Sequence, residues 1–389
     1  SRSTSLTLTE DDYHSGRLQL ALTSGGDITA QVSGGVIGGL LDARREVLDP
    51  AEEQLGRMAI AITSAVNDQN HAGIDLRGQL GGDLFAPITG TALQASANTG
   101  NATAQVGIAD AGAITGDDYQ LKYDGSSWSM TNASTGAAVA LSGSGTAADP
   151  LTGAGISITL AGTPAAGDRF LVEPARQAAS QVQLATTDTS AIAAAAPVSA
   201  SAATGNTGTA TISAPTVLDA GNAALMSGVT IAFTSATTYS INGSGSYTYS
   251  AGGNIDFNGW RVQIKGAPAT GDTFSISANG ANSGDNRNAR AMSALSSAGV
   301  LDGGLTSVTS ANAALVSSTG STAQQASLRA NAQNAILGDT QKQRDSVSGV
   351  NLDEEAADLV RFQQAYQAAA RIIQVADTVF QSLLQAAQG

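Results

Sequence analysis

The sequence contains no cysteine, and only 4% of its 389 residues are aromatic and 13% charged. The absence of cysteine excludes a disulfide framework, a thiolate nucleophile and a cysteine metal site. Basic residues are scarce too, since 18 Lys and Arg stand against 32 Asp and Glu, a formal net charge of -14. This balance argues against nucleic-acid binding and against docking on anionic lipid, which both need a basic surface.

No run of about 18 consecutive apolar residues occurs, so neither a transmembrane helix nor membrane insertion is expected. The first four residues are not followed by the apolar segment of a signal peptide. What the chain has in abundance is Gly, with 45 residues, together with Ser, Thr and Ala. This composition favours strands with small side chains, many turns and closely packed helices, and it suits a polar active site poorly.

The first 33 residues predict short strands. Arg17–Leu22 alternates with period two, Gly25-Gly26 offers a turn, and Ile28–Val32 alternates again. Helical spacing begins after the glycine-rich segment Gly34–Gly39, which we interpret as a joint because it fits neither a dinucleotide fingerprint nor a phosphate loop.

Two helices are predicted next, a short one over Gly38–Leu48 and a longer one starting at Pro50. Asp49 is the expected N-cap of the longer helix, and Gly73, just after His71, its expected C-cap. The apolar stripe predicted for this helix consists of Leu55, Met58, Ile62, Ala65 and Val66.

From about Phe85 to Gly280 the spacing of turn residues predicts an all-β region, and this region contains an internal repeat. Gly100–Val106 is echoed by Gly205–Ile212, and Gly162–Phe170 by Gly266–Phe274, at offsets of 105 and 104 residues. The two similar offsets predict two copies of a β module, with Ala191–Pro197 as a short helical turn or linker between them.

Helices return after Asn282. The spacing predicts one helix over Asn288–Ala298 that stops at Gly299, and a long one over Leu305–Val347 that weakens near Gly320. Ser348-Gly349 breaks the pattern, and the last helix starts at an N-cap, Asn351, followed by three acidic residues, and runs to Gln388.

The last helix carries an unbroken apolar repeat of 3.5 residues, the spacing of a coiled-coil seam. Its positions are Leu359, Phe362, Tyr366, Ala369, Ile373, Ala376, Phe380 and Leu383, with a shoulder of Ile372, Val375, Val379 and Leu384. Two interpretations stay open: the helix packs on other helices of its own chain, or it packs on a further N-terminal helix and on other subunits.

No catalytic, cofactor or metal site is predicted. His14 and His71 have no partner at ligand spacing, Asp117-Asp118 is typical of a turn, and Asp353–Glu355 of a helix N-terminus. Residues 75–83 resemble a calcium loop only faintly, because the alternating Asp/Asn ligands and the closing Glu are absent.

Two stretches resemble a known family. Val350–Ala357 and Phe362–Ala368 closely resemble the C-terminal signature of the flagellar hook-associated protein 1 family, of which rod and hook proteins share a looser version. Gly38–Asp42, Val47–Pro50, Leu55–Arg57 and Asn67–Phe85 are similar to a middle segment of the same family that hook proteins lack. The resemblance covers roughly residues 34–89 and 281–388, and the Gly-x-Pro-Ala-x-Gly-Asp repeat recurs in inserted domains of flagellar axial proteins.

The resemblance implies a fold of the α+β multidomain class: a rod-like helical core formed from both ends of the chain, two inserted β-rich modules and a C-terminal coiled-coil helix. The parts expected are 1–89 with 281–350 as a discontinuous helical core, 90–197 and 198–280 as β modules, and 351–389 as the assembly helix. It also implies an N-terminal helix before Ser1, so we expect the sequence to be part of a longer chain.

The function implied is a structural subunit, not an enzyme, at the junction between hook and filament. The implied partners are further copies of the chain, the hook protein, the second hook-associated protein and an export chaperone on residues 351–388; no cofactor is implied. The implied location is the extracellular flagellum, reached through the flagellar secretion channel. The alternatives are another axial protein of the hook or distal rod, or a surface adhesin that binds through its β modules.

Overall fold

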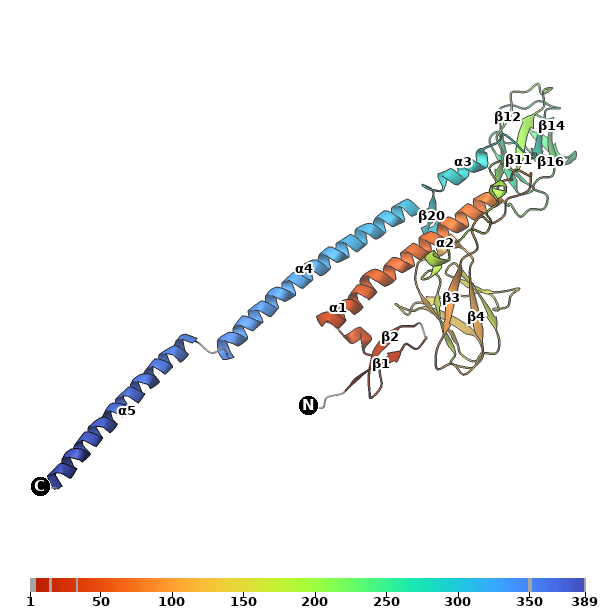
Figure 1. Ribbon diagram of the computed structural model, residues 1–389. Coiled ribbons are helices and arrows are strands. Elements are labelled where there is room, and N and C mark those ends of the chain that lie inside the picture. The colour runs from red at the N-terminus through yellow and green to blue at the C-terminus, as the bar shows by residue number, and fades with distance from the viewer. Residues whose placement is uncertain (1–4, 14–15, 33, 349–351, 388–389) are drawn as a thin grey trace. The chain divides into compact units, whose positions relative to one another are not determined.

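The computed structural model describes residues 5–13, 16–32, 34–348 and 352–387 (Figure 1). The chain divides into two compact units, residues 1–320 and 321–389. A β-hairpin opens the described chain, helices follow it and also close the chain, and β-sheets lie between these helices, which confirms the predicted α+β fold class. None of the helices in the described part of the chain is long and apolar enough to cross a bilayer.

The N-terminal segment is a β-hairpin. β1 (Leu6–Glu10) pairs antiparallel with β2 (Leu18–Leu22), and Gly25 and Gly26 adopt positive φ in the predicted turn. The predicted strand Ile28–Val32 is wrong, because residues 29–31 form a 3-10 turn. Asp27 accepts hydrogen bonds from the Thr29 backbone N–H and hydroxyl, at 2.8 and 2.6 Å, and this local capping displaces the extended conformation.

The two predicted helices join into one continuous helical segment. α1 (Gly35–Ala43) leads through a π-helical turn, Arg44–Leu48, directly into α2 (Asp49–His71). The prediction of Asp49 as an N-cap is therefore wrong, since Asp49 and the residue before it are both helical. The π turn explains the continuity: proline lacks an N–H and crowds the preceding turn, and the wider turn accommodates it. The Asp49 side chain is left free for other partners.

The predicted apolar stripe of α2 is right only in part: Met58 is 6% exposed, but the most deeply buried residues lie outside the stripe. Ile60 and Ala61 are fully buried, whereas Leu55 is 46% exposed. Ala72, not Gly73, is the C-cap. The glycine at position 73 is required by packing instead, because a Cβ there would collide with the side chain of Asn288.

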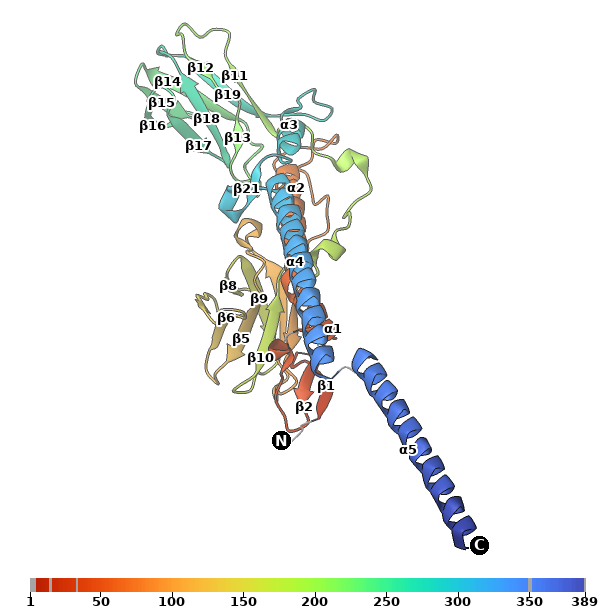
Figure 2. The same ribbon diagram turned by 90° about the vertical axis from the view of Figure 1, so that its left-hand side faces the viewer.

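The first β module is one antiparallel sheet of order β7-β6-β5-β10-β3-β4-β9-β8 (Figure 2). Its core includes Ala59 and Ile60 of α2. Leu121, Ile158, Phe170 and Val172 are fully buried in it. Its strands are β3 (Thr89–Gln94), β4 (Thr103–Ile108), β5 (Tyr119–Tyr123), β6 (Trp128–Asn132), β7 (Ala138–Val139), β8 (Leu151–Gly153), β9 (Ile156–Ala161) and β10 (Arg169–Glu173).

The second β module has two sheets, of order β11-β19-β14-β15-β16 and β12-β18-β13, with β17 also pairing with β18. Trp260, Phe274 and Ile231 are fully buried between them. The strands are β11 (Val198–Ala202), β12 (Thr211–Ile212), β13 (Thr216–Val217), β14 (Val229–Ser235), β15 (Thr238–Ile241), β16 (Ser244–Thr248), β17 (Asn254–Phe257), β18 (Trp260–Lys265) and β19 (Thr273–Ala278). Residues 189–191 form a 3-10 turn, and the following residues to Pro197 form a non-helical linker.

The internal repeat corresponds to a hydrogen-bonded turn that occurs once in each β module. In the first module the Asp168 carboxylate accepts hydrogen bonds from the backbone N–H groups of Thr99, Gly100 and Ala165, at 3.0, 3.3 and 2.8 Å. In the second module Asp272 accepts those of Thr207, Gly208 and Ala269, at 2.8, 3.1 and 2.8 Å.

The structure corrects the alignment of the first half of this repeat. Gly100 corresponds to Gly208 and not to Gly205, because both precede the same turn and both lie against the Asp carboxylate. Asn98 and Asn206 then match as well, each exchanging two hydrogen bonds with the backbone after the Asp. The segment between the matched glycine and the matched aspartate therefore differs in length between the two modules. The similar sequence offsets did not reveal this difference.

After the second module the chain returns through α3 (Arg287–Ala294), β20 (Gly299–Leu301) and β21 (Thr306–Ser307). α3 is shorter than predicted, and Gly299 starts a strand instead of stopping a helix. A glycine is required at this position because a Cβ there would collide with the backbone of Gly304 in the β20–β21 turn. α4 (Val308–Ser348) is one helix through Gly320, so the predicted weak point is wrong. The Ser307 hydroxyl accepts the N–H of Ser310 and caps its start.

The last helix, α5, spans Leu352–Ala387. Its three first-turn acidic residues, Asp353, Glu354 and Glu355, suit the positive end of the helix dipole. The predicted break at Gly349 and the predicted N-cap Asn351 lie outside the described residues.

Candidate functional site

α5 presents the predicted assembly face to solvent. Phe362, Tyr366 and Ile373 are 73%, 78% and 64% exposed. The other seam positions, Leu359, Ala369, Ala376, Phe380 and Leu383, are exposed too, as are the shoulder residues Ile372, Val375, Val379 and Leu384. At about 25 cal/mol per Å² of apolar surface, burying these side chains is worth on the order of 10 kcal/mol. A long isolated helix with such a face gains most of its stability by packing on a partner.

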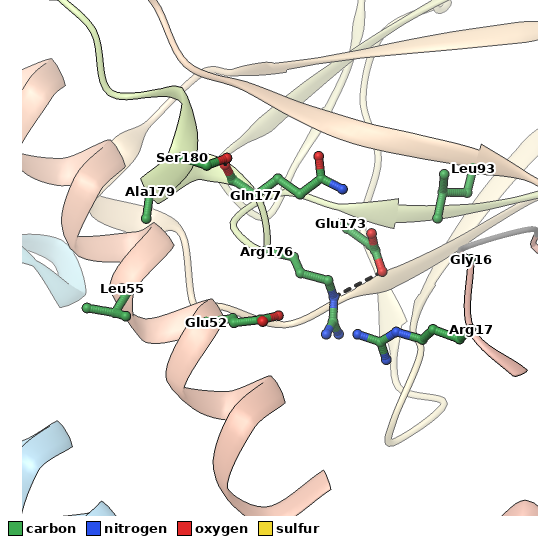
Figure 3. A pocket seen from close by; sticks show the side chains of 10 residues that line it. All are labelled: Gly16, Arg17, Glu52, Leu55, Leu93, Glu173, Arg176, Gln177, Ala179 and Ser180. Carbon is green, nitrogen blue, oxygen red and sulfur yellow. Dashed lines mark hydrogen bonds and ion pairs between the residues drawn. The ribbon is translucent and has the colours of Figure 1, made fainter. Parts of the chain in front are cut away.

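A second feature, which the sequence analysis missed, is a buried ion-pair cluster around Arg176. Its guanidinium lies 2.6 Å from Asp118, 2.9 Å from Glu53, 3.0 Å from Glu173 and 3.3 Å from Asp49. The Arg176 side chain is only 11% exposed. It stands at the centre of a pocket of about 670 Å³ between α2, the end of β10 and the residues before β2 (Figure 3).

A second arginine completes the cluster. Arg17, next to β2, donates to both carboxylate oxygens of Asp49, each at 3.1 Å. The helical position of Asp49 is what allows this contact, since a capping aspartate would turn toward its own helix backbone. The cluster therefore joins the hairpin, the start of α2 and the first β module.

Burial raises the pKa of three carboxyl groups in the cluster, those of Glu53, Asp118 and Glu173. Burial, followed by the charge of Asp118, raises the pKa of Glu53 to about 7, although Arg176 opposes the shift. Burial also raises the pKa of Asp118 and of Glu173. Glu53 therefore gains or loses its proton close to neutral pH. Since every charged group in the cluster already has a partner in the chain, we interpret it as a structural joint and not as a ligand site.

The same face of α2 makes further close contacts with the first module and with the turn between β20 and β21. The Arg57 side chain, which is buried, donates to the Ile114 carbonyl at 2.8 Å and to Asp302 at 2.6 Å. Beside it, a Cβ at Gly56 would collide with the carbonyl of Ala175. Gly56 and Arg57 are therefore the residues through which α2 contacts the first module: the glycine allows the close approach, and the arginine donates hydrogen bonds beside it.

The remaining predicted residues lie apart from these features. His71 pairs with Asp83 at 3.0 Å on the surface, and His14 lies outside the described residues. Asp75 accepts the backbone N–H groups of Arg77 and Gln79 and pairs with the Arg77 side chain. Across the residues that the structure describes, no group of three or more His, Cys, Asp or Glu side chains is placed to hold a metal ion.

A β-hairpin followed by helices, inserted β modules and a long terminal helix with an exposed apolar face define a multidomain α+β protein. The model of the flagellar hook-associated protein FlgK helical domain matches residues 1–85, and that of the flagellar hook-associated protein 1 D2-like domain matches residues 93–174. The model of the C-terminal region of flagellar basal body rod proteins FlgEFG matches residues 341–386.

The structure of the flagellar hook junction protein FlgK from Burkholderia pseudomallei is similar, with a TM-score of 0.76 and 32% sequence identity. That match covers 89% of this chain and 71% of the other. Flagellar hook-associated protein 1 of Escherichia coli is 27% identical over 352 residues, and that of Salmonella typhimurium 26%. Each of these matches covers 90% of this chain and 49% of the relative, so the chain spans about half the length of the curated relatives. The chain belongs to the family of flagellar hook-associated protein 1, FlgK.

Proposed function

We propose that this chain is a structural subunit of the bacterial flagellum that forms the junction between hook and filament. The single observation that carries the proposal beyond family membership is the exposed 3.5-residue seam of α5. A seam of eight apolar side chains at a spacing of 3.5 residues, six of them large, is suited to lateral packing between subunits in a helical assembly.

The proposed partners follow the same reasoning. The seam residues of α5 contact other copies of the chain and, at the two ends of the junction zone, the hook protein and the second hook-associated protein. Before export through the flagellar channel, an export chaperone covers the same helix. The chaperone shields the apolar face of α5 from water and prevents premature assembly. Burial of this face is worth on the order of 10 kcal/mol.

The proposed division of labour assigns assembly to residues 351–389 and a discontinuous helical core to residues 1–89 with 281–350. Residues 90–197 and 198–280 are the two β modules, each with its own core. Another axial protein, of the hook or distal rod, is disfavoured because the FlgK helical-domain model matches residues 1–85.

The experiment is complementation of a strain that lacks its junction protein, using the full-length gene. The seam variant carries Phe362→Asp and Ile373→Asp. The matched control carries Gln364→Asp and Thr378→Asp, which place the same two charges on the opposite face of the same helix. Filament attachment is scored by electron microscopy, and filament subunit shed into the medium is measured by immunoblot.

We expect the wild-type and control genes to restore hook-anchored filaments, and the seam variant to shed filament subunits. Restoration by the seam variant would remove the role assigned to α5. Failure of the wild-type gene, with the protein exported and folded, would overturn the junction function itself.

A further inference from the structure

The carboxyl groups of the Arg176 cluster face one another across the boundary between α2 and the first β module. Asp49 and Glu53 belong to α2. Glu173 belongs to β10, and Asp118 directly precedes β5. All of them contact Arg176, a single cation whose side chain is 11% exposed. Like charges held this close in a poorly hydrated site repel one another, so the removal of one charge by a proton favours contact between α2 and the module.

One acceptor at this boundary has no hydrogen bond. Asp118 Oδ2 accepts from the Arg176 guanidinium at 2.6 Å, whereas Asp118 Oδ1 is buried and accepts from no residue that the structure describes. Glu53 Oε1 lies 2.9 Å from the same nitrogen, Nη2, so the carboxyl groups of Glu53 and Asp118 are neighbours. A buried acceptor without a partner costs free energy. A protonated carboxyl group beside it carries the O–H donor that it needs.

We propose that Glu53 and Asp118 form a proton-binding site across the boundary between α2 and the first β module, and that release of this proton loosens the docking of the module. The proton comes from water and returns to it. While it is bound, the Glu53 carboxyl donates a hydrogen bond to the Asp118 carboxylate; after it leaves, two neighbouring carboxylates repel each other. The device depends neither on α5 nor on the junction function.

The site changes its protonation near neutral pH. Burial, and next the charge of Asp118, raises the pKa of Glu53 from 4.5 to about 7. When the module separates from α2, water reaches Glu53 and its pKa returns towards the reference value. The docked state therefore binds the proton more tightly than the separated state. Docking is weakened as the pH rises from 4.5 to 7, and it changes little above pH 7.

The charged groups around this pair come from every element that meets here. They are Asp49, Glu52 and Arg57 of α2, Arg44 of the π turn, Arg17 before β2, and Asp117, Glu173 and Arg176 of the first module. Arg176 opposes protonation of Glu53, whereas Asp49 and Asp117 favour it. Two of the other cations have partners of their own, since Arg17 pairs with Asp49 and Arg57 with Asp302. Figure 3 shows how Arg17 and Arg176 approach each other in this pocket.

The first experiment observes the proton itself, in the full chain without added cysteine. Infrared difference spectra across pH 5.5 to pH 8.5 record the C=O stretch of protonated carboxyl groups. We expect a protonated carboxyl that titrates with a midpoint of about 7 and that Glu53→Gln removes. Glu52→Gln, in the same turn of α2, is the matched control and should leave the signal in place. A neutral-pH carboxyl signal that persists in Glu53→Gln, or none in the wild type, overturns the proton site.

The second experiment measures opening of the boundary with a single thiol. Ala178 is 1% exposed and packs in one core with Ala59 and Ile60 of α2. Since the chain has no cysteine, Ala178→Cys gives one thiol that a maleimide reaches when the boundary opens. Dividing its labelling rate by that of the urea-unfolded chain at the same pH removes the titration of the thiol. Ser240→Cys, buried in the second module, is the control thiol, and circular dichroism checks each fold.

We expect the relative labelling rate of Ala178→Cys to rise roughly tenfold or more from pH 5.5 to pH 7 and then to level off. That of Ser240→Cys should stay constant. Glu53→Gln in the Ala178→Cys chain should abolish the pH dependence, and Glu52→Gln should preserve it. A relative rate that does not change with pH, or one that changes equally in the Glu53→Gln chain, overturns the role of the proton in docking.

Discussion

The Arg176 guanidinium donates to the Asp118 carboxylate at 2.6 Å, across 58 positions of sequence, and this contact closes the joint between α2 and the first β module. Asp118 precedes β5, whereas Arg176 follows β10, so the pair holds two neighbouring strands of the sheet where they reach the helix. Glu53 and Asp49 on α2 contact the same guanidinium. The strength of the joint therefore depends on how many of these carboxyl groups are charged.

Replacing Arg176 by Met should destabilise the first module strongly. The change leaves Asp118, Glu173 and Glu53 without their shared cation in a poorly hydrated site, and breaking a buried pair in this way costs about 3–5 kcal/mol. The measurement is urea unfolding followed by the emission of Trp128, in a Trp260→Phe background, because the only two tryptophans lie one in each module.

Arg261→Met is the matched control for Arg176→Met. Arg261 also pairs with an aspartate at 2.6 Å, but both side chains of that pair are about half exposed. Because Arg261 lies on β18, its effect is read by Trp260 in a Trp128→Phe background, and the midpoint of the second module should not move. Equal effects of the two substitutions would mean that burial of the Arg176 cluster does not matter.

Glu53→Gln should change how stability depends on pH. The pKa of Glu53 is about 7 in the folded chain, mainly because of burial, and 4.5 in the reference state. Between these values the folded chain holds a proton that the unfolded chain has lost, so stability falls as the pH rises from 4.5 to 7. Glutamine keeps the shape without the charge, and we expect it to add about 1 kcal/mol above pH 7 and little below pH 5.

The check for Glu53→Gln is the urea midpoint of the first module at intervals from pH 5 to pH 9. Glu52→Gln, on the exposed side of the same turn, serves as the control and should run parallel to the wild type. A Glu53→Gln profile that also runs parallel to the wild type would show that this carboxyl does not hold the proton.

Local signals predicted the elements of this fold, and long-range contacts decided the rest. Helical spacing after Pro50, the turn rhythm of the β modules and the heptads of α5 are all properties of neighbouring residues, and each corresponds to an element in the structure. The continuity of α1 and α2 through a π turn was not visible, because Asp49-Pro50 is also the ordinary signal for a helix start.

The sequence predicted the burial of Met58 in α2 but neither the rest of the buried face of α2 nor the Arg176 cluster. Leu55 faces outward and Ile60 inward because the first module docks at Gly56-Arg57, a contact made by residues far away in the chain. Asp49 and Glu53 are one helical turn apart on one face, which is a weak signal. Nothing near Arg176 in sequence indicates that its guanidinium meets carboxylates from α2 and from the residue before β5.

Gly56→Ala should loosen the docking of the first module. The new methyl group would collide with the Ala175 carbonyl, and neither backbone can move without breaking its own hydrogen bonds, so we expect a cost of about 3 kcal/mol. Gly39→Ala in α1 is the control, because no atom lies within 4 Å of a Cβ there and alanine favours a helix by about 0.5–1 kcal/mol. Limited proteolysis and the Trp128 urea midpoint measure the two changes. A Gly56→Ala chain as stable as the Gly39→Ala chain would contradict the close approach.

Asp168→Asn and Asp272→Asn should each unfold one module and spare the other. Each aspartate organises the same turn by accepting three backbone N–H groups, and these bonds lower the pKa of both. A carboxylate with a lowered pKa stabilises the fold above its reference pKa of 3.8, and the stabilisation is lost as the pH falls through the lower folded value. At pH 7 asparagine replaces one acceptor oxygen by an NH₂ group, which faces a backbone N–H and repels it. Asp168→Asn should therefore lower the midpoint reported by Trp128 and leave that reported by Trp260 in place, and Asp272→Asn should do the reverse. If both tryptophans respond to either substitution, the two copies of the repeat unfold as one cooperative unit and not as separate modules.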